Sequence, residues 1–277
     1  MGEWTPGPAW LFCPADRPDR YRKALAAADV VVLDLEDAVA PAGKDAAREA
    51  LRSLADDVLD LERTVVRVNA AGSADHARDL ALTKDIGVRR VMLAKAEQAP
   101  DVTSLAHEVV VLLETPAGIQ HAGALAAEDN VVAVMWGADD LVAGLGGTAS
   151  RHADGRYRDV ARYARSRALV AAKASGRLAL DGVHMDIGDV DGLAGECEDA
   201  VAVGFDATVA IHPSQLAVIR AAYTPATEHV DWARRLLEHV GDDCSVTTFE
   251  GRMVDGPIYQ QAERVLRLAA TTGAGRS

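Results

Sequence analysis

The stretch Val109-Val110-Val111-Leu112-Leu113, with Glu114 directly after it, decides the fold class. It is apolar at every position, rich in β-branched residues and bounded by turn-forming residues, as is a second run from Val131 to Trp136. A strand without polar alternation is buried on both faces, which is typical of parallel sheets covered by helices. We therefore predict two buried parallel strands.

Runs of this kind recur along the whole chain and alternate with helical segments. The predicted strands are Trp10–Cys13, Val30–Leu35, Thr64–Val68, Arg90–Ala94, Val109–Leu113, Val131–Trp136, Leu178–Val183 and Ala207–Ile211. Between most of them lie Ala-rich, charged segments with helical spacing, namely 17–28, 44–54, 74–86, 117–127, 157–175 and 190–203. About eight buried strands separated by helices predict an α/β fold, the closed (β/α)8 TIM barrel, rather than an open sheet.

The last part of the chain falls outside this repeat. Helices are predicted over 214–222, 230–239 and 257–269, and a chemically rich loop over 249–257. We assign residues 1–223 to the barrel and residues 224–277 to a C-terminal helical extension.

Composition limits the classes of protein that the chain can belong to. The 277 residues carry a net charge of −13, which argues against a nucleic-acid or anionic-membrane surface. Three widely spaced cysteines without a CxxC pair indicate neither zinc nor a redox pair, and fit a reducing compartment. The first eight residues lack the features of a signal peptide, and no apolar run is long enough to span a bilayer. We expect a cytoplasmic protein.

Acidic residues follow two consecutive predicted strands. Glu114 ends one strand and Asp140 lies in the loop after the next. The carboxyl ends of barrel strands meet at one end, where active sites of this fold lie. Mg²⁺ takes one or two carboxylates from the protein and completes its shell with water and substrate oxygens. The sequence therefore predicts an Mg²⁺ site at Glu114 and Asp140, although two hydrogen-bonded structural carboxylates remain the alternative.

Other polar residues at strand ends allow more than one interpretation. Lys95 stands where a Schiff-base aldolase would place its lysine, but an ion pair with Glu97 is the simpler interpretation. Asp34 suits a role in orienting a backbone turn, and we leave it outside the site. His212, before Pro213, indicates a loop anchor or a wall of the cofactor site.

Taken together in order, seven motifs resemble those of the citrate lyase β-subunit-like family of carbon–carbon lyases (CitE-like, in the HpcH/HpaI aldolase and malyl-CoA lyase superfamily). They are LDLEDAV at 33–39 with Lys44, VRVN at 66–69, KAE at 95–97, LET at 113–115, GADDL at 137–141, IHPSQ at 211–215 and GRMVD at 251–255. The resemblance covers nearly the whole chain. It implies a barrel, usually trimeric, that binds Mg²⁺ and an acyl-CoA at the strand ends.

Roles follow from the resemblance by position. Glu114 and Asp140 would hold Mg²⁺, with Glu114 also near substrate, and Arg67 would grip the carboxylate and keto oxygen of the substrate. Glu36 and Asp37 would orient metal-bound water. Asp255 would be the proton-transfer group, reaching into the site of a neighbouring subunit.

The acyl-CoA partner would contact basic residues near the site. We assign Arg17, Lys23 and Arg165 to its phosphates, although solvated surface positions are the alternative for such side chains. Pro14-Ala15-Asp16 departs from the family pattern in the loop that approaches the nucleotide, which puts the manner of CoA binding in doubt.

The resemblance implies an Mg²⁺-dependent lyase that cleaves a β-hydroxyacyl-CoA to a keto acid and acetyl-CoA, or catalyses the reverse condensation. The candidate acyl groups are malyl, citramalyl, citryl and hydroxymethylglutaryl. Two alternatives stay open: an acyl-CoA thioesterase on the same scaffold, and a non-catalytic protein that binds keto acids or CoA.

Overall fold

The computed structural model describes residues 4–241 and 245–272, and it contains the predicted barrel. Eight parallel strands close in sequence order: β1 (Ala9–Pro14), β2 (Val30–Asp34), β3 (Thr64–Val68), β4 (Arg90–Leu93), β5 (Glu108–Leu113), β6 (Val131–Trp136), β7 (Leu178–Asp181) and β8 (Ala207–Ala210). The fold prediction is confirmed, including strand β7.

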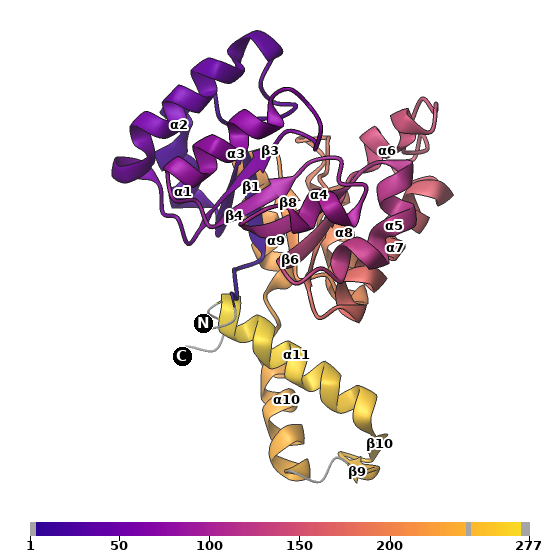
Figure 1. The fold of residues 1–277 in the computed structure, drawn as a ribbon. Coiled ribbons are helices and arrows are strands. Elements are labelled where there is room, and N and C mark those ends of the chain that lie inside the picture. Colours follow the sequence, from indigo (N-terminus) through magenta and orange to yellow (C-terminus); the bar gives the residue numbers. More distant parts are fainter. Residues whose placement is uncertain (1–3, 242–244, 273–277) are drawn as a thin grey trace.

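Helices connect the strands and cover the outside of the barrel (Figure 1). They are α1 (Tyr21–Ala27), α2 (Lys44–Val58), α3 (His76–Asp85), α4 (Ala99–Thr103), α5 (Pro116–Ala126), α6 (Ala138–Gly144), α7 (Asp159–Ala174), α8 (Val190–Val203) and α9 (Leu216–Tyr223). Short 3₁₀ helices precede α1, α2 and α9, at Pro18–Arg20, Pro41–Gly43 and Pro213–Gln215. The sequence analysis did not predict α4 or α6, which have only five and seven residues.

The alternation of side chains along each strand divides the core into two parts. Val30 and Val32 on β2 and Val110 and Leu112 on β5 belong to a cluster inside the barrel. The residues between them belong to a larger cluster that packs strands against helices. Because side chains two apart point to the same face, the next inward positions at the carboxyl ends are Asp34 on β2 and Glu114 after β5. The period of the strands therefore carries these carboxylates into the mouth of the barrel.

A helical extension follows the barrel, as the sequence predicts. It consists of α10 (Thr227–Val240), a hairpin of β9 (Thr247–Phe249) and β10 (Arg252–Val254), and α11 (Gly256–Thr272). The two helices pack on each other around a small core of their own, formed by Ala233, Leu236, Val254, Tyr259 and Ala262. Figure 1 shows this unit projecting from the barrel, with the hairpin at its far end.

The hairpin corrects one detail of the sequence analysis. Residues 249–257 were expected to form a loop, but the first of them pair in antiparallel strands. Glu250 and Gly251 both have positive φ, +48° and +77°, the conformation that a two-residue type I′ turn requires. The turn was missed because Glu is an uncommon residue at a left-handed position.

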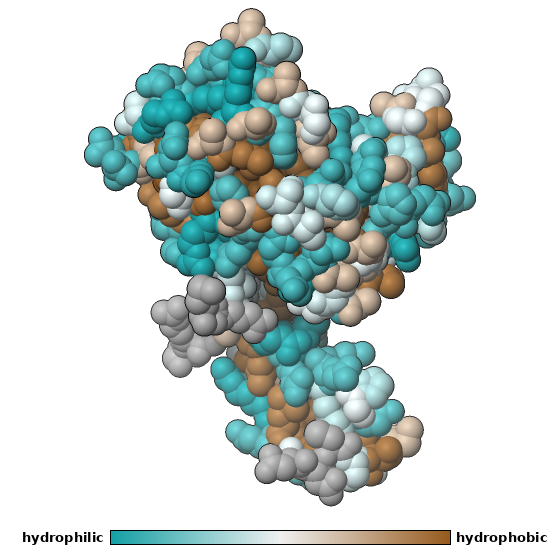
Figure 2. Space-filling view, in the orientation of Figure 1, coloured by the Kyte–Doolittle hydropathy of each residue, from teal (hydrophilic) through white to brown (hydrophobic). Residues whose placement is uncertain are grey.

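The extension exposes several apolar side chains on its surface. Figure 2 shows hydrophobic side chains along the projecting unit. On and beside the hairpin, Met253 is 73% exposed and Val246 is 66% exposed.

Within the described residues, no helix combines the length and the apolar character needed to cross a membrane.

Candidate active site

A cavity of about 320 Å³ opens at the carboxyl ends of the strands. Its lining combines apolar residues from the strands with polar residues from the loops that follow them. Phe12, Leu112, Met135 and Trp136 form the apolar part, and Asp34, Asp37, Arg67, Glu114, Asp139 and Asp140 form most of the polar part. Five of the six residues predicted for metal, substrate or catalysis therefore lie in or beside one cavity, namely Glu36, Asp37, Arg67, Glu114 and Asp140.

Arg67 is held by a residue that the sequence analysis left outside the site. Asp34 and Arg67 are register partners on β2 and β3. The Nε and Nη2 atoms of Arg67 donate to the two carboxylate oxygens of Asp34 at 2.7 and 2.6 Å. Both side chains are buried, and the guanidinium lies 4.7 Å from the ring centroid of Phe12. A bidentate pair of this kind fixes the plane of the guanidinium, while Nη1 points toward Glu36.

Asp34 also has the role expected from its sequence. Its carboxylate accepts hydrogen bonds from the backbone N–H groups of Glu36 and Ala38, at 2.8 and 3.0 Å. One buried carboxylate thus both shapes the loop after β2 and orients Arg67. The expectation that it only orients a turn is wrong, because spacing along the chain cannot reveal a cross-strand partner.

Glu114 lies deep in the site, with only 3% of its side chain exposed. Its Oε1 accepts from the backbone N–H of Lys95 at 3.0 Å. A Cβ on Gly137 would stand 2.9 Å from the Glu114 Cβ and 3.0 Å from its Oε2, so this approach requires glycine. Burial raises the pKa of Glu114 to about 8, against the lowering effect of Lys95 and Arg67. The protein thus builds a tight cradle around a desolvated carboxylate.

Glu36 and Asp37 lie in the loop after β2, which a buried ammonium group supports. The Nζ of Lys44 donates to the carbonyl oxygens of Leu35 and Glu36 and to the side-chain oxygen of Asn69, at 2.8, 2.9 and 2.8 Å. Burial raises the pKa of Glu36, although Arg67 and Lys95 oppose this effect. The loop is therefore fixed from below while its carboxylates face the cavity.

Lys95 carries the second cation of the site, and its predicted partner is wrong. Its Nζ contacts Oε1 of Glu36 and lies 3.2 Å from Asp37, instead of pairing with Glu97. The same atom lies 3.9 Å from Glu114 and 3.8 Å from Asp140. The prediction of a structural ion pair was correct in kind, but the chain folds so that the partners come from distant loops.

The donors present suit a hard divalent cation. Asp140 lies in the first turn of α6, and its neighbour Asp139 is turned to Ser150, whose hydroxyl donates to it at 2.5 Å. One position, that of the Lys95 ammonium, lies within 4 Å of both Glu114 and Asp140, so a single cation can be near both carboxylates. Among the described residues, no group of three or more acidic, His or Cys side chains is arranged so that it could hold a metal ion by itself. Two carboxylates are nevertheless enough for Mg²⁺, which keeps water and substrate ligands.

Arg165 lies behind the wall of the site, in a neighbouring cavity of about 730 Å³. Its Nη2 is 2.7 Å from Asp181, and Nη1 pairs with Asp199. Asp181 also accepts from the indole N–H of Trp136, whose ring packs edge-on against Tyr157. The guanidinium therefore supports the wall through Asp181, and its assignment to CoA phosphates remains a prediction.

The other two basic residues assigned to CoA lie on the exposed segment after β1. Arg17 forms an exposed ion pair with Asp19 at 3.1 Å, and Lys23 is exposed on α1. Both belong to the connection that leaves the carboxyl end of β1. Their assignment to the CoA phosphates remains a prediction.

Asp255 lies apart from the other predicted residues. It follows β10 directly, and its carbonyl oxygen accepts from the first turn of α11, from Ile258 and Tyr259. Figure 1 places β10 at the far end of the extension, well away from the barrel of the same chain. Within one chain, Asp255 thus does not join the site.

His212 and His184 make contacts that support loops near the site. The ring of His212 accepts from the N–H of Ser214 and caps a 3₁₀ helix, so the loop-anchor interpretation is confirmed. His184 contacts Glu196 at 2.9 Å and Asp189 at 3.3 Å, beside the wall formed by Asp181.

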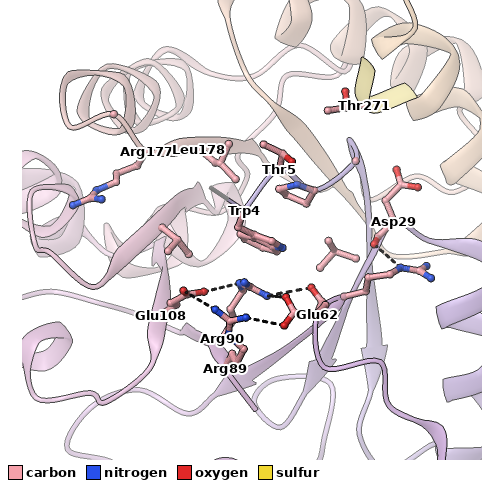
Figure 3. A pocket seen from close by; sticks show the side chains of 16 residues that line it. Trp4, Thr5, Asp29, Glu62, Arg89, Arg90, Glu108, Arg177, Leu178 and Thr271 are labelled. Carbon is pink, nitrogen blue, oxygen red and sulfur yellow. Dashed lines mark hydrogen bonds and ion pairs between the residues drawn. The ribbon is translucent and has the colours of Figure 1, made fainter. Parts of the chain in front are cut away.

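A larger cavity, of about 1150 Å³, lies at the opposite end of the barrel (Figure 3). Here Trp4 covers the guanidinium of Arg90 at 4.1 Å, and Glu62 and Glu108 pair with Arg89 and Arg90. The amino-terminal end of a TIM barrel ordinarily serves stability. Glu62 and Glu108 balance the charges of Arg89 and Arg90, so we assign this cluster a structural role.

Comparison with known proteins agrees with this geometry. The model of the family described as HpcH/HpaI aldolase/citrate lyase matches residues 9–213. The chain belongs to the HpcH/HpaI aldolase/citrate lyase family. The resemblance to this family predicted from the sequence is confirmed, and so is the barrel with a helical C-terminal part.

Two curated members of this family show how wide the similarity is. The citrate lyase subunit beta-like protein of Mycobacterium tuberculosis is 58% identical over 264 residues, covering 95% of this chain and 96% of the relative. The mitochondrial citramalyl-CoA lyase of Rattus norvegicus is 29% identical over 301 residues, covering 97% and 88%. These relatives support the prediction of a carbon–carbon lyase.

A solved structure of the family extends the comparison to ligands. It is the CitE protein of M. tuberculosis in complex with magnesium, acetoacetate and coenzyme A. Its chain is 57% identical, superposes with a TM-score of 0.88, and the match covers 96% of this chain and 98% of that one.

Proposed function

We propose that the protein is an Mg²⁺-dependent lyase that cleaves a β-hydroxyacyl-CoA to a keto acid and acetyl-CoA, or forms the same bond in reverse. The observation that carries the proposal is that Arg67 lies in one small cavity with Glu114 and Asp140. Arg67 is buried there and is held by two hydrogen bonds to Asp34. The ligands of the M. tuberculosis relative, magnesium, a keto acid and coenzyme A, are those that such a reaction requires.

Arg67 binds and orients the oxygen atoms next to the bond that breaks. Its Nε and Nη2 atoms are fixed on Asp34, so the remaining N–H groups present a rigid positive surface to the cavity. When the substrate hydroxyl loses its proton, the C–C bond breaks, a carbonyl group forms, and the electron pair moves to the thioester as an enolate, which takes up a proton to give acetyl-CoA. Charge develops on oxygen at both stages, and preorganised donors stabilise it.

Glu114 and Asp140 would hold Mg²⁺, which would supply Lewis-acid stabilisation of the keto and carboxylate oxygens. Glu36 and Asp37 would orient water at the edge of this site. The apolar wall of Phe12, Leu112 and Met135 excludes bulk water from the reacting atoms. A cavity of about 320 Å³ suits the small acyl part, so the CoA nucleotide would stay outside, near Arg17 and Lys23.

The proton would be moved by Asp255 of a neighbouring copy. The hairpin that presents Asp255 stands away from its own barrel and carries exposed Met253, which supports a contact with another subunit. We propose a cytoplasmic homotrimer in which the extension, residues 224–277, completes a neighbour's site.

Incubation with malyl-, citramalyl-, citryl- and hydroxymethylglutaryl-CoA tests the reaction. With Mg²⁺, one thioester should give both a keto acid and acetyl-CoA by mass spectrometry, and a chelator should abolish both. Release of free CoA without a keto acid would instead indicate a thioesterase. Thermal stabilisation by ligand without any product would indicate a binding protein.

Mixed oligomers test the shared site. Asp255→Ala and Arg67→Ala subunits should each be inactive alone, while a mixture should recover part of the activity. Light scattering should give the mass of three chains. A mixture without recovery would place Asp255 outside catalysis or within its own chain.

A further inference from the structure

The ammonium group of Lys95 lies among carboxylates from three separate segments. Glu36 and Asp37 follow β2, Glu114 ends β5, and Asp140 lies in α6. All four contacts are within 4 Å. An ordinary ion pair joins one cation to one or two acidic groups, whereas here one ammonium lies among four carboxyl groups.

The backbone of Lys95 also has an unusual conformation, which directs its N–H toward the same cluster. Its φ is +51°, which is uncommon for a residue with a side chain. In this conformation its N–H donates to Oε1 of Glu114, while its side chain reaches the same group of carboxylates. Strained backbone of this kind persists where the surrounding structure fixes it, and it is often found at functional sites.

Lys95 differs from Arg67 in mobility. Arg67 is locked by its two hydrogen bonds to Asp34 and has 11% of its side chain exposed. Lys95 has 29% of its side chain exposed and a flexible four-carbon stem. The first cation is therefore a fixed part of the site, whereas the second can move toward solvent.

We propose that Lys95 is a resident counter-ion, a positioning residue that holds the carboxylates together in the metal-free protein and competes with Mg²⁺ for Glu114 and Asp140. This inference rests on the proposed function, because it concerns the same metal. On metal binding the ammonium moves away from these two carboxylates and keeps its contacts with Glu36 and Asp37. Lys95 thereby lowers the affinity for the metal while protecting the empty site from charge repulsion.

The sign of the effect distinguishes competition from simple support. Loss of a supporting residue would weaken Mg²⁺ binding, because the ligands would be less well placed. Loss of a competing cation removes repulsion and leaves the carboxylates free for the metal. We therefore expect Lys95→Met to bind Mg²⁺ at least about tenfold more tightly, which corresponds to about 1.4 kcal/mol.

The experiment is calorimetric titration of Mg²⁺ into the full-length protein stripped with chelator, together with thermal unfolding of the metal-free form. Lys95→Met should lower Kd and also lower the metal-free Tm. Lys95→Arg keeps the charge and should not tighten binding. Lys84→Met, an exposed lysine on α3 before β4 at the other end of the barrel, is the matched control and should resemble wild type.

Lys95→Gly makes the test independent of folding defects in the Met variant, since glycine accepts the positive φ without strain. It should also tighten binding. Unchanged or weaker Mg²⁺ binding in the folded Lys95→Met and Lys95→Gly variants, with normal binding in wild type, would overturn the role of Lys95 alone. Absence of binding in wild type would overturn the metal site of the proposed function and the inference with it. Glu114→Gln should abolish the signal, which would show that the titration reports on this site.

Discussion

The two ends of the barrel both carry clusters of charge, but the balance differs. At the amino-terminal end, Glu62 and Glu108 pair with Arg89 and Arg90, and the cations and anions offset each other. At the carboxyl end, Arg67 and Lys95 face a larger set of carboxylates: Asp34, Glu36, Asp37, Glu114 and Asp140.

This difference separates a structural cluster from a binding site. Buried or half-buried charges are tolerated when they are paired, and balanced pairs need nothing further. An excess of carboxylates in a partly desolvated cavity is stabilised by an added cation. The larger cavity therefore belongs to the structural end, and the smaller, unbalanced one is the candidate active site.

The largest effect is expected from Glu114→Gln, which removes a buried carboxylate that we assign to the metal at the unbalanced end. Turnover should fall by two or three orders of magnitude, about the loss measured when one preorganised electrostatic group is deleted. Product formation from the active thioester, measured with and without chelator, checks this. Circular dichroism should show an intact fold, and activity equal to wild type would contradict the metal assignment.

Asp34→Asn tests the buried ion pair between Asp34 and Arg67 at the same end. The change leaves the guanidinium of Arg67 without its full counter-charge in a buried position, so we expect a loss of about 3–5 kcal/mol in the free energy of unfolding. Urea denaturation measures it. A loss below about 1 kcal/mol would show that Arg67 is held mainly by other contacts.

The pH dependence of the metal-free protein tests the desolvation of Glu114. Its pKa is raised to about 8 in the folded chain from an ordinary value of 4.5. Between these values the folded state holds a proton that the unfolded state has lost, so rising pH lowers the free energy of unfolding. Denaturation from pH 5 to 8 in chelator should show this decline, and Glu114→Gln should show less of it.

The smallest effect is expected from Glu62→Gln at the balanced end. The Glu62 side chain is 62% exposed, and an exposed ion pair contributes little to stability because solvent screens it. Urea denaturation should detect little or no change, and turnover should match wild type. A clear loss of turnover would contradict the purely structural role of this end.

Much of the site could be predicted because the barrel converts strand periodicity into position. Once the strand before Glu114 was recognised, its inward side and its end of the barrel followed from the period of two. Position after a strand likewise identified Asp140, and the family resemblance added the roles of Arg67, Glu36 and Asp37.

The errors share a physical cause, which is that partners were sought nearby in the chain. Lys95 was paired with Glu97, two residues away, although its actual partners Glu36 and Asp37 lie 59 and 58 residues away. Asp34 was assigned a local turn, and its register partner across the strands was missed.

The sequence by itself determined the barrel, the end at which its polar residues gather and the family, because hydrophobic periodicity and motif order are properties of the chain. Tertiary structure alone decided which charges meet. It placed Asp34 on Arg67, brought Lys95 among four carboxylates, and carried Asp255 away from its own barrel. Electrostatic partners depend on distances in space, and those distances exist only after the strands have closed.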